Sequence, residues 1–371
     1  MAAATIEDIR LFVRLARRDA AGTERCLRAR SASLADFVES ATAQGLSVVL
    51  LRALADSPLH AALSHAQVAA LEERRRRQAT RLQILLGALA ELAERFASAG
   101  QPFLLLKGPY LAARFYGDMR GREFVDLDLL VPRADRERAF HLLAAAGYSR
   151  RSRALFGVGL TSFFVHGFDF VAGDANVDLH WCLSRHPSLH LDEAKIWARQ
   201  GSYTVDGRSY AVLSPADEVV FAVLSLLRDL ERGRPKIKNV VDLVQIVAAI
   251  DAEIDWEALF ENGRGDGTFG PLVNVLALCL EVADAHDLAP RLDAALARHA
   301  GRQVPARRAA WPLQFRPARF GLGNKLWAAR AYDATPAAWL LWWAASLPFR
   351  IAVHRWRRTP KLAAAATLRR Q

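Results

Sequence analysis

An alternating run of acids and aliphatic residues, FVDLDLLV at 124–131, constrains this chain more than any other segment. In an extended strand, residues two apart in the sequence point to the same face of the sheet. Asp126 and Asp128 are therefore predicted to share one face, while Val125, Leu127, Leu129 and Val131 point into a core on the other. Two carboxylates this close repel each other, and the repulsion raises the pKa of one of them unless a cation neutralises the pair. The run therefore predicts a strand that holds a cation.

Magnesium is the cation that this pattern favours, because it prefers carboxylate oxygens together with substrate phosphates. The alternative is an edge strand whose two acids are only solvated. The preceding segment favours the metal, since an apolar run at 102–106 ends in Lys107 and Gly108 and continues into a helical pattern. Glycine lets backbone amides approach an anion, and the helix N-terminus that follows is favourable for phosphate.

Further candidate ligands lie on both sides of the two aspartates. Arg120 and Arg122 precede them, and arginine is suited to bidentate contacts with phosphate. The segment NVDLHW at 176–181 repeats the alternation and is predicted to place Asp178 and His180 on one face of a neighbouring strand. A third carboxylate there would complete a metal site able to activate a hydroxyl and to stabilise a leaving pyrophosphate.

Simpler roles exist for several of these residues. Lys107 could cap the strand end, one of the two arginines could be solvated, and His180 could be a hydrogen-bonded structural histidine. His186 and His190 could be combined with His180 in a zinc site, but Pro187 lies between them and argues against a continuous helix. The sequence therefore does not favour zinc.

Three segments, LLLKG, RGREFVDLDLLV and VDLHW, together resemble the uncharacterised nucleotidyltransferase-like proteins of the polymerase-beta superfamily. The resemblance extends from about residue 72 to about residue 250. It implies an α+β fold in which a small mixed-sheet core, carrying the carboxylates, is wrapped by N-terminal and C-terminal helices. It also implies metal-binding, catalytic roles for Asp126, Asp128 and Asp178, and a nucleotide-facing turn at Gly108.

The activity that this resemblance implies is Mg²⁺-dependent transfer of a nucleoside monophosphate from an NTP, such as ATP, to an acceptor hydroxyl. The acceptor could be RNA, a protein or a small molecule, and the alternative is a non-catalytic nucleotide- or RNA-binding protein on the same fold. The turn departs from the superfamily pattern, because no serine follows its glycine and the interval to the aspartates is longer than is typical. The residues expected to contact the nucleotide or orient a ligand are Lys107, Gly108, Arg120, Arg122 and His180.

Asp242 falls where this family tends to carry an aspartate in its helical domain. One interpretation is that it closes over the nucleotide. The other is a surface pair with Lys238, which lies four residues earlier on the same predicted helix.

Four regions are expected along the 371 residues. Apolar residues recur at helical spacing near both ends of the first region, and Ser214 followed by Pro215 and two acids predicts a helix start. The regions are an N-terminal helical region at 1–100, the nucleotidyltransferase core at 101–213, a helical domain at 214–300 and a basic, Trp-rich helical region at 301–371.

The net charge of +11 is concentrated in the last region, which has 14 Lys/Arg against one acid and six of the nine tryptophans. Three interpretations of residues 337–358 compete: a helix that packs Trp339, Leu340 and Trp343 onto the core, a nucleic-acid surface, or an interfacial anchor on anionic lipid. Packing is the favoured one. An anionic partner of this basic region is the alternative.

The remaining composition predicts a cytoplasmic protein. The three cysteines are far apart, without metal-ligand spacing, as is typical of packing residues in a reducing compartment. The N-terminus has Glu7 and Asp8 in place of the long apolar run of a signal peptide. No apolar stretch has the length that a transmembrane helix needs.

Overall fold

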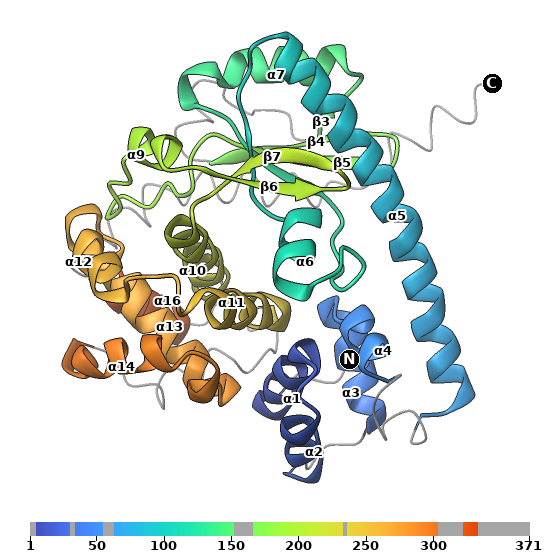
Figure 1. The fold of residues 1–371 in the computed structure, drawn as a ribbon, viewed down its shortest axis with the longest axis vertical. Helices are drawn as coiled ribbons and strands as arrows, with labels where there is room; N and C mark the ends of the chain where they lie inside the picture. The colour runs from blue at the N-terminus through green and yellow to red at the C-terminus, as the bar shows by residue number, and fades with distance from the viewer. Residues whose placement is uncertain are drawn as a thin grey trace.

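The computed structural model describes residues 5–29, 34–54, 63–151, 166–232, 236–302 and 322–332. They form a mixed α/β fold with one five-stranded sheet and one hairpin, as the sequence predicted (Figure 1). The strands are β1 (Leu104–Leu105), β2 (Leu127–Leu130), β3 (Ser149–Arg150), β4 (Gly167–Ala172), β5 (Ala175–His180), β6 (Gly201–Val205) and β7 (Arg208–Val212). The helices are α1 (Ile6–Arg17), α2 (Ala20–Ala29), α3 (Leu34–Gln44), α4 (Ser47–Leu54), α5 (His65–Ser98), α6 (Pro109–Tyr116), α7 (Arg136–Ala145), α9 (Glu193–Ala198), α10 (Pro215–Glu231), α11 (Ile237–Ile250), α12 (Trp256–Asp266), α13 (Phe269–Ala283), α14 (Pro290–Arg298) and α16 (Leu322–Ala331).

The five-stranded sheet has the strand order β1-β2-β5-β4-β3. β2 and β5 are parallel, whereas the other three neighbouring pairs are antiparallel. The parallel register places Leu127 opposite Val177 and Leu129 opposite Leu179, and all four side chains are buried. The alternate residues of these two central strands therefore face the opposite side of the sheet together.

Different helices cover the two faces of the sheet (Figure 1). On the apolar face, the Phe140 ring of α7 packs against the rings of Phe168, Phe170 and Trp181. On the other face, the Phe221 ring of α10 lies edge-on to the His180 ring, with 6.3 Å between centroids. The polar face of the two central strands is therefore opposite α10.

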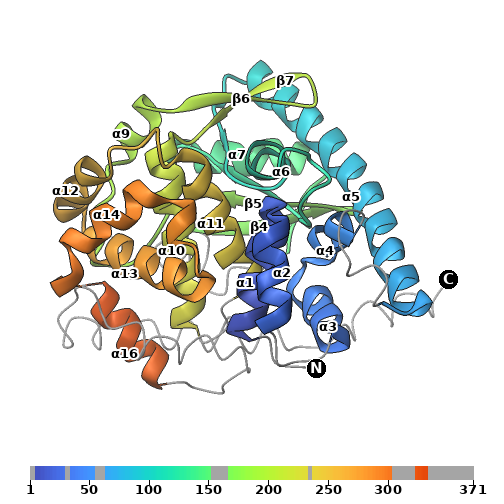
Figure 2. The ribbon, with the colours of Figure 1, turned by 60° about the horizontal axis from the view of Figure 1, so that its bottom comes forward.

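The N-terminal helices pack against the helical part that follows the sheet (Figure 2). α1 contacts α11 and α13, and α5 contacts α4 and α7. The apolar stripes predicted for this region are buried, including Phe12 and Val13 on α1 and Leu85, Leu89 and Leu92 on α5. The predicted helix start is also confirmed, since the Ser214 hydroxyl accepts a hydrogen bond from the Asp217 amide and Pro215 is the first residue of α10.

α16 is the one described helix of the basic C-terminal region. It contacts α10 and α13, and its Trp327 and Ala328 are buried. The segment at 337–358, for which packing, nucleic-acid and lipid interpretations compete, lies outside the described residues. None of the helices in the described ranges combines the length and apolarity that crossing a bilayer requires.

The aspartate-bearing strand is shorter than the sequence predicted. β2 begins at Leu127, so that Asp126 lies in a bend before the strand, and the Val125 side chain is 56% exposed where a core residue was expected. The Val125 carbonyl accepts hydrogen bonds from the Arg81 and Asn176 side chains. These side-chain contacts replace strand pairing at this position, so the alternation that buries the leucines does not extend to Val125.

Candidate active site

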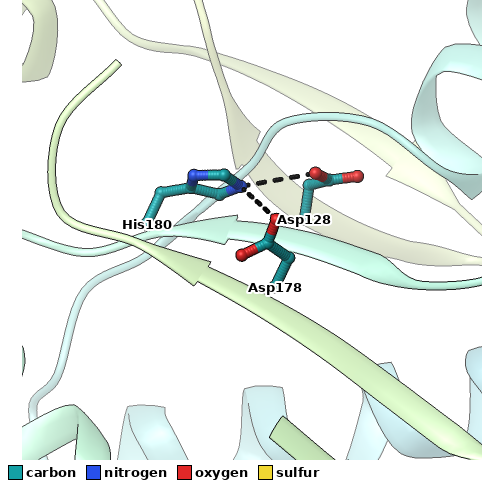
Figure 3. A group of neighbouring side chains, drawn as sticks. All are labelled: Asp128, Asp178 and His180. Atoms are coloured by element: carbon teal, nitrogen blue, oxygen red, sulfur yellow. Dashed lines mark hydrogen bonds and ion pairs between the residues drawn. The ribbon is translucent and has the colours of Figure 1, made fainter. Parts of the chain in front are cut away.

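Two aspartates on adjacent parallel strands form the centre of the candidate site. Asp128 on β2 pairs in register with Asp178 on β5, and Leu130 pairs with His180 two residues further on. Because residues paired across neighbouring strands point to the same face, the two carboxylates and the His180 imidazole share the polar face (Figure 3). The side chains of Asp128 and Asp178 are 16% and 29% exposed, so solvent reaches both.

His180 bridges the two carboxylates. Its Nε2 atom lies 3.3 Å from Asp128 Oδ1 and 3.3 Å from Asp178 Oδ2 (Figure 3). Burial disfavours the charged imidazole, but the nearby Asp178 and Asp128 carboxylates outweigh it and raise the pKa of His180 to about 9. The imidazolium therefore neutralises part of the negative charge of the pair at neutral pH.

Asp126 belongs to the same electrostatic cluster although it precedes the strand. Burial, followed by repulsion from Asp128 and Asp178, raises the pKa of Asp126 to about 6. Asp128, Asp178 and His180 each offer one ligand atom, and these three atoms lie within 4.8 Å of one another. The Asp126 carboxylate is not part of this group. The metal set predicted from the sequence was the three aspartates, and the tight cluster in the structure has His180 where Asp126 was expected.

This cluster fits a divalent cation. It is the one group of three metal-ligating side chains within the described ranges, and it offers two carboxylates and one imidazole. Carboxylate oxygens suit Mg²⁺, and imidazole suits first-row transition metals. His186, which entered the zinc alternative, stacks instead on Tyr332 with 3.5 Å between ring centroids.

Lys107 and Gly108 lie beside the carboxylates, between β1 and α6. The Lys107 ammonium donates a hydrogen bond to the Ser225 hydroxyl at 3.3 Å and lies 4.5 Å from the centre of the Phe221 ring. Gly108 is the N-cap of α6 with φ 70°, and a Cβ there would lie 3.3 Å from the Asp126 carbonyl oxygen. The turn is therefore packed directly on the segment that carries the aspartates.

The two arginines before the aspartates differ in their surroundings. Arg120 is exposed, whereas the Arg122 guanidinium is buried and donates two 2.7 Å hydrogen bonds to the Asp242 carboxylate. The Tyr116 hydroxyl also donates to Asp242, at 2.7 Å. The structure thus gives Asp242 a role that neither sequence interpretation included, because it is a buried partner of Arg122 and makes no ion pair with Lys238. Phosphate binding by Arg120 or Arg122 stays a prediction.

Three residues near the carboxylates, His166, Ser225 and Arg228, were not singled out from the sequence. The His166 ring stacks on the His180 ring at 5.3 Å, and its Nε2 atom contacts the Arg228 guanidinium, which also donates to Ser225. Lys238, which the sequence suggested only as a surface partner of Asp242, also belongs to these surroundings, and burial, with neighbouring Arg122, lowers the pKa of its ammonium to about 7. Only tertiary packing brings His166 and Arg228 together, and no local pattern marks that contact.

A family model described as an uncharacterised nucleotidyltransferase matches residues 31–282, more than half of the chain. No curated protein matches the chain. Among solved structures, the solution structure of the antibiotic-resistance factor ANT(2'')-Ia aligns over 51% of this chain and 93% of that chain, with 15% identity and a TM-score of 0.36. A structural likeness of this size carries no argument, so the family match stands alone.

Proposed function

The chain belongs to the uncharacterised nucleotidyltransferase family, and we propose that it transfers a nucleoside monophosphate from an NTP to an acceptor hydroxyl in a divalent-metal-dependent reaction. The observation that carries this proposal is the register of β2 and β5, which places Asp128 directly opposite Asp178. Two carboxylates on one partly exposed face, close to several cations, are what a metal–triphosphate substrate requires.

In this reaction the acceptor oxygen forms a bond to the α-phosphorus, and the bond from the α-phosphorus to the bridging oxygen of pyrophosphate breaks. Asp128 and Asp178, with Asp126 beside them, would hold the metal ions, for which Mg²⁺ is the favoured choice. Bound metal would polarise the phosphate oxygens and offset the charge that develops on the leaving pyrophosphate. Asp178, which is more exposed than Asp128, would orient the acceptor.

The residues around the carboxylates have complementary roles in this proposal. Lys107 and the turn at Gly108 would contact the phosphates. Arg120, which is exposed, would neutralise phosphate charge, whereas Arg122 would act through the buried Asp242. His180 would orient the two carboxylates and give up its contact with them in part when a metal binds.

A binding and a transfer measurement test the proposal together. Purified protein is titrated with ATP by calorimetry, with and without Mg²⁺, and is then incubated with each NTP and candidate RNA, protein and small-molecule acceptors. We expect metal-dependent nucleotide binding and an acceptor whose mass increases by one nucleoside monophosphate, with equimolar pyrophosphate. Asp128→Asn should remove both signals.

Two results would contradict an enzyme. Nucleotide affinity that does not depend on the metal, together with no pyrophosphate from any NTP, would favour the non-catalytic nucleotide- or RNA-binding alternative.

Three free cysteines, two of them buried, agree with a cytoplasmic location, which we include in the proposal. Fractionation of cells that express the chain tests that location.

A further inference from the structure

We propose that Ser225 and Arg228 of α10, acting with Lys107, form the subsite for the β- and γ-phosphates of the NTP and hold pyrophosphate as it leaves. This inference rests on the proposed function and assigns the part of the substrate that α10 recognises. No sequence motif marked Ser225 or Arg228.

Two cations converge on one hydroxyl in this subsite. The Ser225 hydroxyl accepts hydrogen bonds from the Lys107 ammonium at 3.3 Å and from the Arg228 guanidinium at 3.4 Å. Neither cation makes an ion pair with a carboxylate in the described part of the chain. Like charges held this close repel each other, so an anion bound between them would relieve that repulsion.

The subsite lies at the edge of the carboxylate cluster. Phe221, one turn before Ser225 on α10, packs on the His180 ring, and Lys107 lies over the same phenyl ring. The positive charges of Arg228 and Lys107 both act on the Asp178 carboxylate. Phosphates bound here would therefore extend from the carboxylates toward α10, as the β- and γ-phosphates of a metal-bound NTP must.

His166 fixes the direction of Arg228. The contact between His166 Nε2 and the guanidinium requires an unprotonated Nε2 that accepts a hydrogen bond. Arginine has five N–H donors, and the contacts with His166 and Ser225 leave donors for phosphate oxygens.

The backbone turn beside the aspartates offers few donors of its own. Pro109 is the first residue of α6 and has no N–H, and the Ala112 amide already donates to the Gly108 carbonyl. The amides of this helix start that lack an intrahelical partner are thus those of Gly108, Tyr110 and Leu111. Side chains must supply most of the contacts to a triphosphate. The side chains of Lys107 and Arg228 meet at the Ser225 hydroxyl and can supply them.

Calorimetry with three ligands tests the subsite: AMP, pyrophosphate, and an ATP analogue with a methylene group between the α- and β-phosphorus, each with Mg²⁺. In Arg228→Gln, we expect the affinities for the analogue and for pyrophosphate to fall by roughly 10- to 100-fold, since hydrogen bonds to charged groups are lost. The affinity for AMP should stay within about twofold. Arg228→Lys should recover part of the loss, and Ser225→Ala should give a smaller loss of the same pattern.

Arg264→Gln is the matched control, because Arg264 pairs with Glu261 on the surface of α12. It should change none of the three affinities. Equal affinity of Arg228→Gln and the parent protein for pyrophosphate and the analogue would overturn the inference, as would an equal loss for AMP. If the parent protein binds the analogue but transfers nothing to any acceptor, the proposed function fails and the subsite stands. If it binds neither the analogue nor pyrophosphate, both fail.

Discussion

Arg122 and Asp242 are separated by 120 residues in the sequence and meet in a buried, bidentate ion pair with both contacts at 2.7 Å. The pair ties the segment before the aspartates to α11, and the Tyr116 hydroxyl donates to the same carboxylate. Burial opposes the charge of Asp242, but Arg122 outweighs it and holds the pKa of Asp242 below its usual value. Each charge is tolerated in the interior because the other is present.

The first prediction concerns the stability that depends on this pair. Asp242→Ala should lower the free energy of unfolding by roughly 3–5 kcal/mol, because it leaves the Arg122 guanidinium buried without a counter-charge. Urea denaturation followed by circular dichroism measures this. Arg264→Gln, which breaks an exposed pair, should cost at most about 1 kcal/mol. Similar costs for the two variants would show that the buried pair does not anchor the segment.

The second prediction separates the carboxylates proposed to be catalytic from surface acids. Asp128→Asn and Asp178→Asn should each lower the transfer rate by roughly 100-fold or more, because a charge that stabilises the transition state is removed. Both side chains are partly exposed, so the thermal unfolding midpoint should change little. Asp174→Asn, in the exposed turn between β4 and β5, is the control and should retain full activity. Full activity in Asp178→Asn would remove that residue from the site.

The third prediction is a pH dependence of stability set by Glu218. This side chain is fully buried on α10, and burial, despite nearby Arg114 and Lys107, raises the pKa of Glu218 to about 8. An exposed glutamate has a pKa of about 4.3, so the folded protein retains a proton that the unfolded chain releases between these values. The contribution of Glu218 to the free energy of unfolding is therefore complete below about pH 4.3 and falls as the pH rises to about 8.

Glu218→Gln should remove this part of the pH dependence, because glutamine does not ionise. We expect the free energy of unfolding of the variant, minus that of the parent protein, to be more favourable at pH 8 than at pH 5. Urea denaturation at both pH values gives the comparison. Parallel pH profiles for the two proteins would count against a protonated Glu218.

The fourth prediction concerns the turn at Gly108. Gly108→Ala should be destabilising by roughly 1–3 kcal/mol from its positive-φ backbone alone, and the new Cβ, 3.3 Å from the Asp126 carbonyl, should also displace Asp126. Gly207→Ala is the matched control, because Gly207 has φ 75° and no atom within 4 Å of such a Cβ. We expect both variants to lose stability, but only Gly108→Ala to lose nucleotide binding. Unchanged ATP affinity in Gly108→Ala would argue that the turn does not face the nucleotide.

Local patterns in the sequence determined the elements that hold the site. The alternation around Asp128 and Asp178 predicted two strands with carboxylates on one face, because side-chain direction in a strand has a period of two. Ser214 and Pro215 predicted the start of α10, since capping involves only neighbouring residues. The predicted mixed α/β fold is confirmed, whereas nucleotide contacts by Lys107, Gly108 and Arg120 stay predictions.

Only the tertiary structure decided which side chains meet across those elements. The alternation predicted a buried Val125, but side chains from α5 and β5 bind its carbonyl and leave it exposed. It gave no indication that Asp242 would neutralise Arg122, or that Arg228 would reach His166 beside the carboxylates. These contacts join residues that are distant in sequence or on separate elements. They follow from how α10 and α11 pack on the sheet, which no local period encodes.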